Sequence, residues 1–153
     1  MKEIIKLEKI TKEYNHKLIL DQVDLSIYEG QSMVFTGHNG SGKSTLLKII
    51  SGLVKPSSGK VVYRDKLLFH YVPERFPKMN LTPWQYLKRM GQMDGIPPKI
   101  LAKRCEKLFS DFFLADMVNI PMKDLSKGTL QKIGVIQALL RTPQVLLLDE
   151  PLS

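Results

Sequence analysis

The sequence predicts an α/β fold with a β-rich start, a strand, loop and helix, a helical middle and a buried last strand, and three observations support it. Before residue 30, apolar Val23, Leu25 and Ile27 alternate with polar residues, which is the period of a half-buried strand. A glycine-rich loop then separates an apolar stretch from a helical pattern. Residues 145–148 are uninterrupted aliphatic residues, as expected of a strand covered on both faces.

Composition limits the classes of protein that this chain can represent. With 153 residues, 43% of them hydrophobic, it fits one globular domain and not a disordered chain. Its single cysteine, Cys105, cannot form a disulfide within the chain, and no apolar run approaches the roughly 18 residues of a membrane span. The N-terminus has no signal-peptide pattern. We therefore expect a cytoplasmic protein.

The formal net charge is +8, from 23 Lys and Arg against 15 Asp and Glu. Such a balance is compatible with a phosphate-bearing partner, and equally with a solvated basic surface that binds nothing. No like-charged run is long enough to indicate a nucleic-acid arm, so a nucleic-acid partner is not expected. Charge alone leaves the function open.

The first half of the chain predicts a strand, a loop, a helix and a further strand. Residues 32–36 are almost entirely apolar and predict a strand covered on both faces. Residues 37–42 form the glycine-rich loop, and residues 44–50 predict a helix that stops at Gly52. A turn at residues 56–59 precedes a short strand at 61–63.

The second half predicts helices, followed by the strand at residues 145–148. One helix begins near Trp84, and Pro97-Pro98 separates it from a second in which Leu101, Cys105, Leu108 and Phe112 share one face. Cys105 is therefore expected in the core. A third helix is expected from Ser126, whose hydroxyl can cap it, to about Leu140. Core positions are also expected for Met79, Met90 and Met93.

The loop Gly37-His38-Asn39-Gly40-Ser41-Gly42-Lys43-Ser44 matches the pattern G-x-x-x-x-G-K-[ST]. Glycines let the backbone approach a polyphosphate, and successive N–H groups with the following helix N-terminus attract anions. Lys43 adds a full positive charge for the β- and γ-phosphates, and the Ser44 hydroxyl is a hard ligand for Mg²⁺. The alternative is a glycine turn beside a surface lysine. The strand and helix expected around the loop favour the phosphate site.

Two carboxylates, Asp149 and Glu150, follow the last predicted strand. Beside a phosphate-binding loop, an acidic residue at this place can hold Mg²⁺, which is the role expected of Asp149. Glu150 can then polarise an attacking water as a general base. Without the loop, the pair would indicate an ordinary polar turn.

The segment Leu125-Ser126-Lys127-Gly128-Thr129, taken with the loop and Asp149-Glu150-Pro151, resembles the ATP-binding cassette (ABC) ATPases. The resemblance covers the whole chain. The family signature is L-S-G-G-Q, so Lys127 replaces a glycine and Thr129 the glutamine, while Ser126 and Gly128 are kept. The resemblance implies that this segment faces the nucleotide bound by a second subunit, where Ser126 and Gly128 touch the γ-phosphate. The alternative is a capped helix start without a ligand.

The resemblance extends to a stacking aromatic and to a metal-sensing loop. Tyr14 is similar to the aromatic that stacks on adenine, although it can also be a strand-end tyrosine that packs on the sheet. Glu74, in Tyr71-Val72-Pro73-Glu74, stands where most members carry a glutamine that senses Mg²⁺ and the γ-phosphate. The implied metal ligands are Ser44, Asp149 and Glu74. The implied nucleotide-binding residues are Tyr14, Gly37, His38, Asn39, Gly40, Ser41, Gly42, Lys43, Ser44 and Thr45.

The resemblance implies a P-loop NTPase fold of the ABC type, with an N-terminal antiparallel β-subdomain, a RecA-like core and a helical subdomain at residues 83–125. Residues 1–153 are expected to be one ATP-binding domain with a core incomplete at its C-terminal side. Family members continue past the acidic pair with a further strand and a histidine, whereas His16, His38 and His70 all precede it. We therefore expect a fragment of a longer protein.

The function implied is that of an ATP-hydrolysing transporter subunit, with Lys43 and Glu150 catalytic and with ATP and Mg²⁺ bound. Its implied partners are a membrane-spanning subunit and a second copy or homologue, which would hold it on the inner face of the membrane. The general likeness of the motifs favours drug or bacitracin-type exporters. Two alternatives stay open: a soluble ABC ATPase acting on ribosomes or DNA, and a nucleotide-binding module without turnover.

Overall fold

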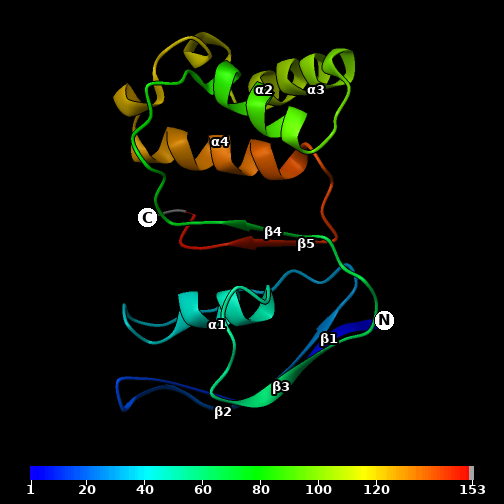
Figure 1. The fold of residues 1–153 in the computed structure, drawn as a ribbon, viewed down its shortest axis with the longest axis vertical. Coiled ribbons are helices and arrows are strands. Elements are labelled where there is room, and N and C mark those ends of the chain that lie inside the picture. Colours follow the sequence, from blue (N-terminus) through cyan, green and yellow to red (C-terminus); the bar gives the residue numbers. More distant parts are fainter. Residues whose placement is uncertain (152–153) are drawn as a thin grey trace. The chain divides into compact units, whose positions relative to one another are not determined.

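The computed structural model describes residues 1–151, which form two compact units that divide after Phe69 (Figure 1). The first unit contains β1 (Glu3–Tyr14), β2 (Lys17–Tyr28), α1 (Lys43–Ile50) and β3 (Ser58–Tyr63). The second begins within β4 and contains β4 (Phe69–Val72), α2 (Pro83–Met93), α3 (Pro98–Asp111), the 3₁₀ turns η1 (Ala115–Met117) and η2 (Met122–Asp124), α4 (Lys127–Leu139) and β5 (Val145–Leu148). Among residues 1–151, no helix combines the length and apolar character needed to cross a membrane.

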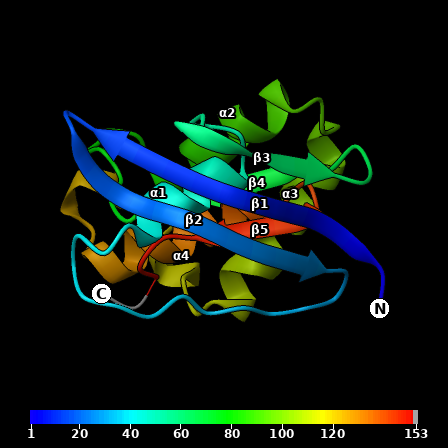
Figure 2. The ribbon, with the colours of Figure 1, turned by 90° about the horizontal axis from the view of Figure 1, so that it is seen from below.

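The first unit is built on an antiparallel sheet in which β1 lies between β2 and β3 (Figure 2). Its buried side chains change phase along β1, from Ile5 and Leu7 to Ile10. The pairing register shifts between Leu7 and Ile10, and Lys9 between them has a φ of 48°. This is a β-bulge, which inserts one residue and returns the next apolar side chain to the core face.

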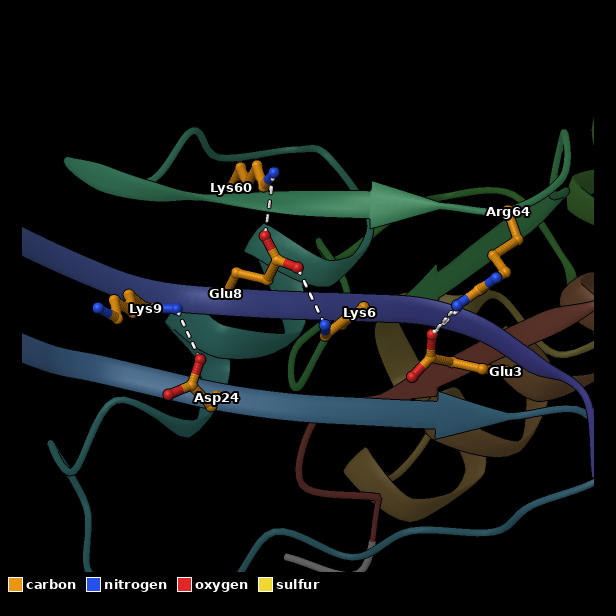
Figure 3. Close-up of polar contacts among 7 residues, drawn as sticks. All are labelled: Glu3, Lys6, Glu8, Lys9, Asp24, Lys60 and Arg64. Carbon is orange, nitrogen blue, oxygen red and sulfur yellow. Dashed lines mark hydrogen bonds and ion pairs between the residues drawn. The ribbon is translucent and has the colours of Figure 1, made fainter.

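The other face of this sheet carries charged side chains (Figure 3). Glu8 lies between Lys6 and Lys60, at 3.1 Å from each ammonium, and Arg64 pairs with Glu3 at 2.6 Å. The hydrogen bonds from Lys60 and then Lys6 hold the pKa of the Glu8 carboxyl below its usual value. At the bulge, the Lys9 backbone N–H donates to Asp24 Oδ1 at 2.9 Å. Because exposed ion pairs stabilise a fold little, the apolar face of the sheet carries most of its stability.

Helix α1 buries four aliphatic side chains and is tied to β3 by one hydrogen bond. Its buried residues are Leu46, Leu47, Ile49 and Ile50. The Tyr63 hydroxyl of β3 donates to the carbonyl of Ile50 at 2.8 Å. Strand and helix are thereby joined at the C-terminal end of α1, and the glycine-rich loop at its other end is left to solvent.

The second unit pairs β4 with β5, and α4 lies along one face of this pair with α2 and α3 beyond it (Figure 1). Thr82 caps α2 in a reciprocal capping box with Gln85. The core expected around Cys105 is confirmed: this residue is fully buried among Leu87, Leu101 and Ile133, and burial raises the pKa of its thiol to about 11. Met79 and Met90 pack against the same cluster. The prediction for Met93 was wrong, because its side chain is 79% exposed.

The strand predicted at residues 32–36 does not form. Val34 is 85% exposed, and within residues 1–151 no strand pairs with this segment. An apolar run states that a segment can be buried, but a strand also needs a neighbour that accepts its backbone hydrogen bonds. Conversely, β4 was not predicted, because four residues with one histidine give no clear period.

Gly91 of α2 provides a test of how tightly the second unit is packed. A Cβ placed there would lie 2.4 Å from Leu101 Cδ1, so Gly91→Ala should overpack the contact between α2 and α3. We expect a loss of about 1 to 2 kcal/mol in the free energy of unfolding, after the helix-propensity gain of alanine. Urea unfolding measures it.

Gly128→Ala is the matched control, since nothing lies within 4 Å of a Cβ at that helical position. Its unfolding free energy should stay the same or rise by up to about 1 kcal/mol. Equal losses in both variants would contradict the packing described between α2 and α3.

Candidate functional site

The glycine-rich loop folds around the ammonium group of Lys43, the first residue of α1. Lys43 Nζ donates to the carbonyl oxygens of Gly37 at 2.7 Å and His38 at 2.9 Å. A Cβ at Gly37 would lie 2.7 Å from Ser41 Oγ, so a side chain there would require Ser41 to move. The result is a closed turn with its lysine held at the N-terminal end of a helix.

The end of this loop rests on β2. Gly42 caps α1 with a φ of 96°, and a Cβ there would lie 2.9 Å from a methyl group of Leu20 and 3.2 Å from the carbonyl of Ile19. Both the left-handed backbone and the close approach require glycine. Asn39, Ser44 and Thr45 belong to the same loop and first helical turn, as predicted.

Tyr14 lies at the end of β1, where the chain turns into β2. Its side chain is 45% exposed, and the Lys12 ammonium lies 4.8 Å from the centre of its ring. Figures 1 and 2 both show the β1–β2 hairpin end and the loop before α1 at the same end of the first unit. This placement is compatible with a stacking role, which stays a prediction.

In the second unit, Asp149 follows β5 and is 6% exposed. Its backbone N–H donates to the carbonyl of Val72, and the Tyr71 hydroxyl donates to Asp149 Oδ2 at 2.6 Å. Burial, with this hydrogen bond second, raises the pKa of Tyr71 above its ordinary value. Tyr71 therefore stays protonated at neutral pH and orients a buried carboxylate.

The predicted signature segment forms the start of α4. The Ser126 hydroxyl accepts the Thr129 backbone N–H at 3.2 Å and lies 2.8 Å from the Thr129 hydroxyl, so the predicted cap is confirmed. Leu125 precedes the cap, and Gly128 lies in the first turn. Lys127 Nζ lies 3.4 Å from Glu74 Oε1. Two departures from the family pattern, a lysine and an acid, thus form an ion pair.

Gln131, one turn further along α4, connects the loop of Glu74 with the loop of Glu150. Its Nε2 donates to the carbonyl of Glu74 at 3.3 Å and to that of Glu150 at 3.0 Å, and the residue is 6% exposed. Glu150 has a φ of 47°, which is uncommon for a residue other than glycine. A pocket of about 400 Å³ lies beside Gln131, and Asp149 and Val72 also line it.

Sequence reasoning assigned no role to Tyr71 or Gln131, although both stand inside quoted segments. A tyrosine three positions before Glu74 gives no sign that it will meet a residue 78 positions away. Gln131 gives no clear signal either, because Lys132 beside it is also polar, and only the structure shows that Gln131 is buried and Lys132 exposed.

In the first unit, a glycine-rich loop closed around a lysine at a helix N-terminus is typical of a P-loop nucleotide-binding protein. The sequence matches the family described as "ABC transporter" over residues 20–153. The chain belongs to this family.

Similar proteins agree with this assignment. An uncharacterized ABC transporter ATP-binding protein of Methanocaldococcus jannaschii is 32% identical over all of this chain and 58% of the relative's length. The zinc import ATP-binding protein ZnuC of Acinetobacter baylyi is 34% identical over 99% of the chain and 56% of its own length. Among solved structures, an ATP-binding subunit of an ABC transporter is 25% identical with a TM-score of 0.82, covering 97% of this chain and 67% of that one. The chain thus spans a little over half the length of these curated relatives.

Tyr71→Phe tests how the buried carboxylate of Asp149 is supported. The change removes one donor and should lower the free energy of unfolding by about 1 to 3 kcal/mol, because a hydrogen bond to a charged acceptor is lost. Chemical denaturation followed by circular dichroism measures it. In the Tyr71→Phe background, Asp149→Asn should cost less than it does alone, since a neutral amide tolerates the missing donor. Additive costs would contradict the coupling.

Proposed function

We propose that these residues form the ATP-binding part of a transporter ATPase subunit that binds and hydrolyses Mg·ATP. The observation that carries the proposal is the loop of residues 37–42 closed around the Lys43 ammonium. Family membership supports ATP as the nucleotide.

Binding rests on the loop of the first unit. Its glycines allow the backbone N–H groups to approach a triphosphate, and the N-terminus of α1 favours negative charge. Lys43, now shared between two loop carbonyls, can donate to phosphate oxygens instead. During hydrolysis this charge stabilises the developing negative charge on the transferred group. Tyr14 is proposed to stack on the adenine.

Ser44 offers a hydroxyl and Asp149 a buried carboxylate, and both are hard oxygen donors of the kind that Mg²⁺ prefers. We propose these two as its ligands, with Glu74 holding the metal or its water. When bound, Mg²⁺ neutralises charge on the β- and γ-phosphates. Tyr71 keeps the Asp149 carboxylate oriented for this task.

Glu150 is proposed as the general base. Its carboxylate would accept a proton from the water that attacks the γ-phosphorus, as the bond to the bridging oxygen breaks and ADP and phosphate form. Its unusual φ of 47° supports this role, because strained backbone gathers at functional sites.

The family supports two partners. A second copy or a homologue would place its own Leu125–Thr129 segment against the nucleotide bound by this copy. Closure on ATP and opening after hydrolysis would then move a membrane-spanning subunit, as a ligand-driven two-state change. That subunit would hold the protein at the inner face of the membrane.

The cargo is a finer proposal. The exporter branch, which the general likeness of the motifs favours, stays a prediction. Relatives at 30 to 34% identity include zinc import ATP-binding proteins instead. We therefore propose metal-ion import as the first assignment to test. A deletion strain that grows normally under zinc chelation, and loses resistance to a drug or peptide instead, would favour the exporter.

Lys43→Ala and Glu150→Gln together test the site, in the protein as the cell makes it. Lys43→Ala should weaken ATP binding at least about tenfold, because a charged contact to phosphate is worth more than 1.4 kcal/mol. Glu150→Gln should keep binding and lower hydrolysis by about a hundredfold or more. Nucleotide titration and phosphate release measure the two effects.

Lys48→Ala is the matched control, because it removes the same charge from the last turn of the same helix. It should change neither binding nor hydrolysis. If Lys43→Ala binds ATP as Lys48→Ala does, the loop is not the nucleotide site.

A further inference from the structure

We propose that Gln131 is a positioning residue that fixes the main chain of Glu150 relative to the Glu74 loop. The inference rests on the proposed function, since Gln131 would support the proposed general base, Glu150, and the metal-sensing acid, Glu74. It adds a residue whose side chain touches neither nucleotide nor metal and acts through the two loops.

The hydrogen bonds of Gln131 have the form that such a role requires. A primary amide has two N–H donors on one nitrogen, and Nε2 lies within reach of both the Glu74 and Glu150 carbonyls, at 3.3 and 3.0 Å. With the side chain 6% exposed, water cannot readily replace either bond. One planar group therefore sets the separation of two loops that follow neighbouring strands.

The same face of α4 holds the Glu74 loop at two further points. Lys127, four residues earlier, pairs with the Glu74 carboxylate at 3.4 Å. Gly134, three residues later, leaves room for the Phe76 ring, since a Cβ there would lie 2.5 Å from it. Residues at this spacing share one helix face. The helix thus fixes the Glu74 loop, and Gln131 extends this support to Glu150.

Precise placement matters more for Glu150 than for a binding residue. A general base must lie within hydrogen-bond reach of the attacking water, and a displacement of about 1 Å can lower the rate about a hundredfold. Nucleotide affinity depends on the loop around Lys43 instead. Loss of Gln131 should therefore lower kcat and leave KM nearly unchanged.

The test is Gln131→Met in the protein as the cell makes it, a change that keeps the length of the side chain and removes both donors. We expect kcat for ATP hydrolysis to fall roughly ten- to a hundredfold, with KM and ATP affinity within about twofold of wild type. Gln131→Asn keeps the amide on a shorter side chain that can reach one carbonyl. Its kcat should therefore lie between those of the wild type and Gln131→Met. The asparagine variant also serves if the methionine variant does not fold.

Gln137→Met is the matched control, because Gln137 lies on the same helix and loses only its bond from the Tyr86 hydroxyl, at 2.6 Å. It should keep kcat within about twofold of wild type. The proposal is overturned if Gln131→Met keeps the wild-type kcat, if both methionine variants lower kcat equally, or if Gln131→Met changes ATP affinity as much as kcat. Glu150→Gln distinguishes failure of the proposed function from failure of the positioning role. If Glu150→Gln still hydrolyses ATP, the proposed function is refuted. If Glu150→Gln is inactive while Gln131→Met is fully active, only the positioning role is refuted.

Discussion

The pairing of β4 with β5 is the constraint on which the second unit's site depends. It brings Tyr71 to Asp149, 78 positions further along the chain, and it places the loops of Glu74 and Glu150 close enough for one glutamine to bond both. Neither loop has regular structure of its own. Their positions follow from the strands before them and from α4, whose buried side chains anchor it in the helical core.

The first unit contains the glycine-rich loop of residues 37–42, for which we propose an anionic ligand. Glycine at position 42 allows a close approach to β2 and a left-handed backbone, and the turn closes around a lysine of the helix that follows it. Sheet and helix are joined at the opposite end of α1, through Tyr63 and Ile50. This junction lies away from the loop, and residues 37–40 of the loop are exposed to solvent.

Two departures from the family pattern contact each other in the structure. Glu74 replaces the expected glutamine and Lys127 a glycine, and their opposite charges lie 3.4 Å apart. Thr129, in place of glutamine, directs its hydroxyl to the capping Ser126. The two opposite charges therefore balance each other within the second unit.

The sequence by itself determined α1, α3 and β5, because each has a helical or fully apolar pattern of its own, and it predicted the phosphate loop, because that motif lies in contiguous residues. It also identified Cys105 as core and Ser126 as a cap. Tertiary structure alone decided that residues 32–36 are unpaired, that Met93 is exposed, and that Tyr71 and Gln131 support the acidic residues. Each of these depends on what another segment provides, whether a ladder partner, a covering surface or a backbone carbonyl. A local pattern carries no information about such partners until the strands have been brought together.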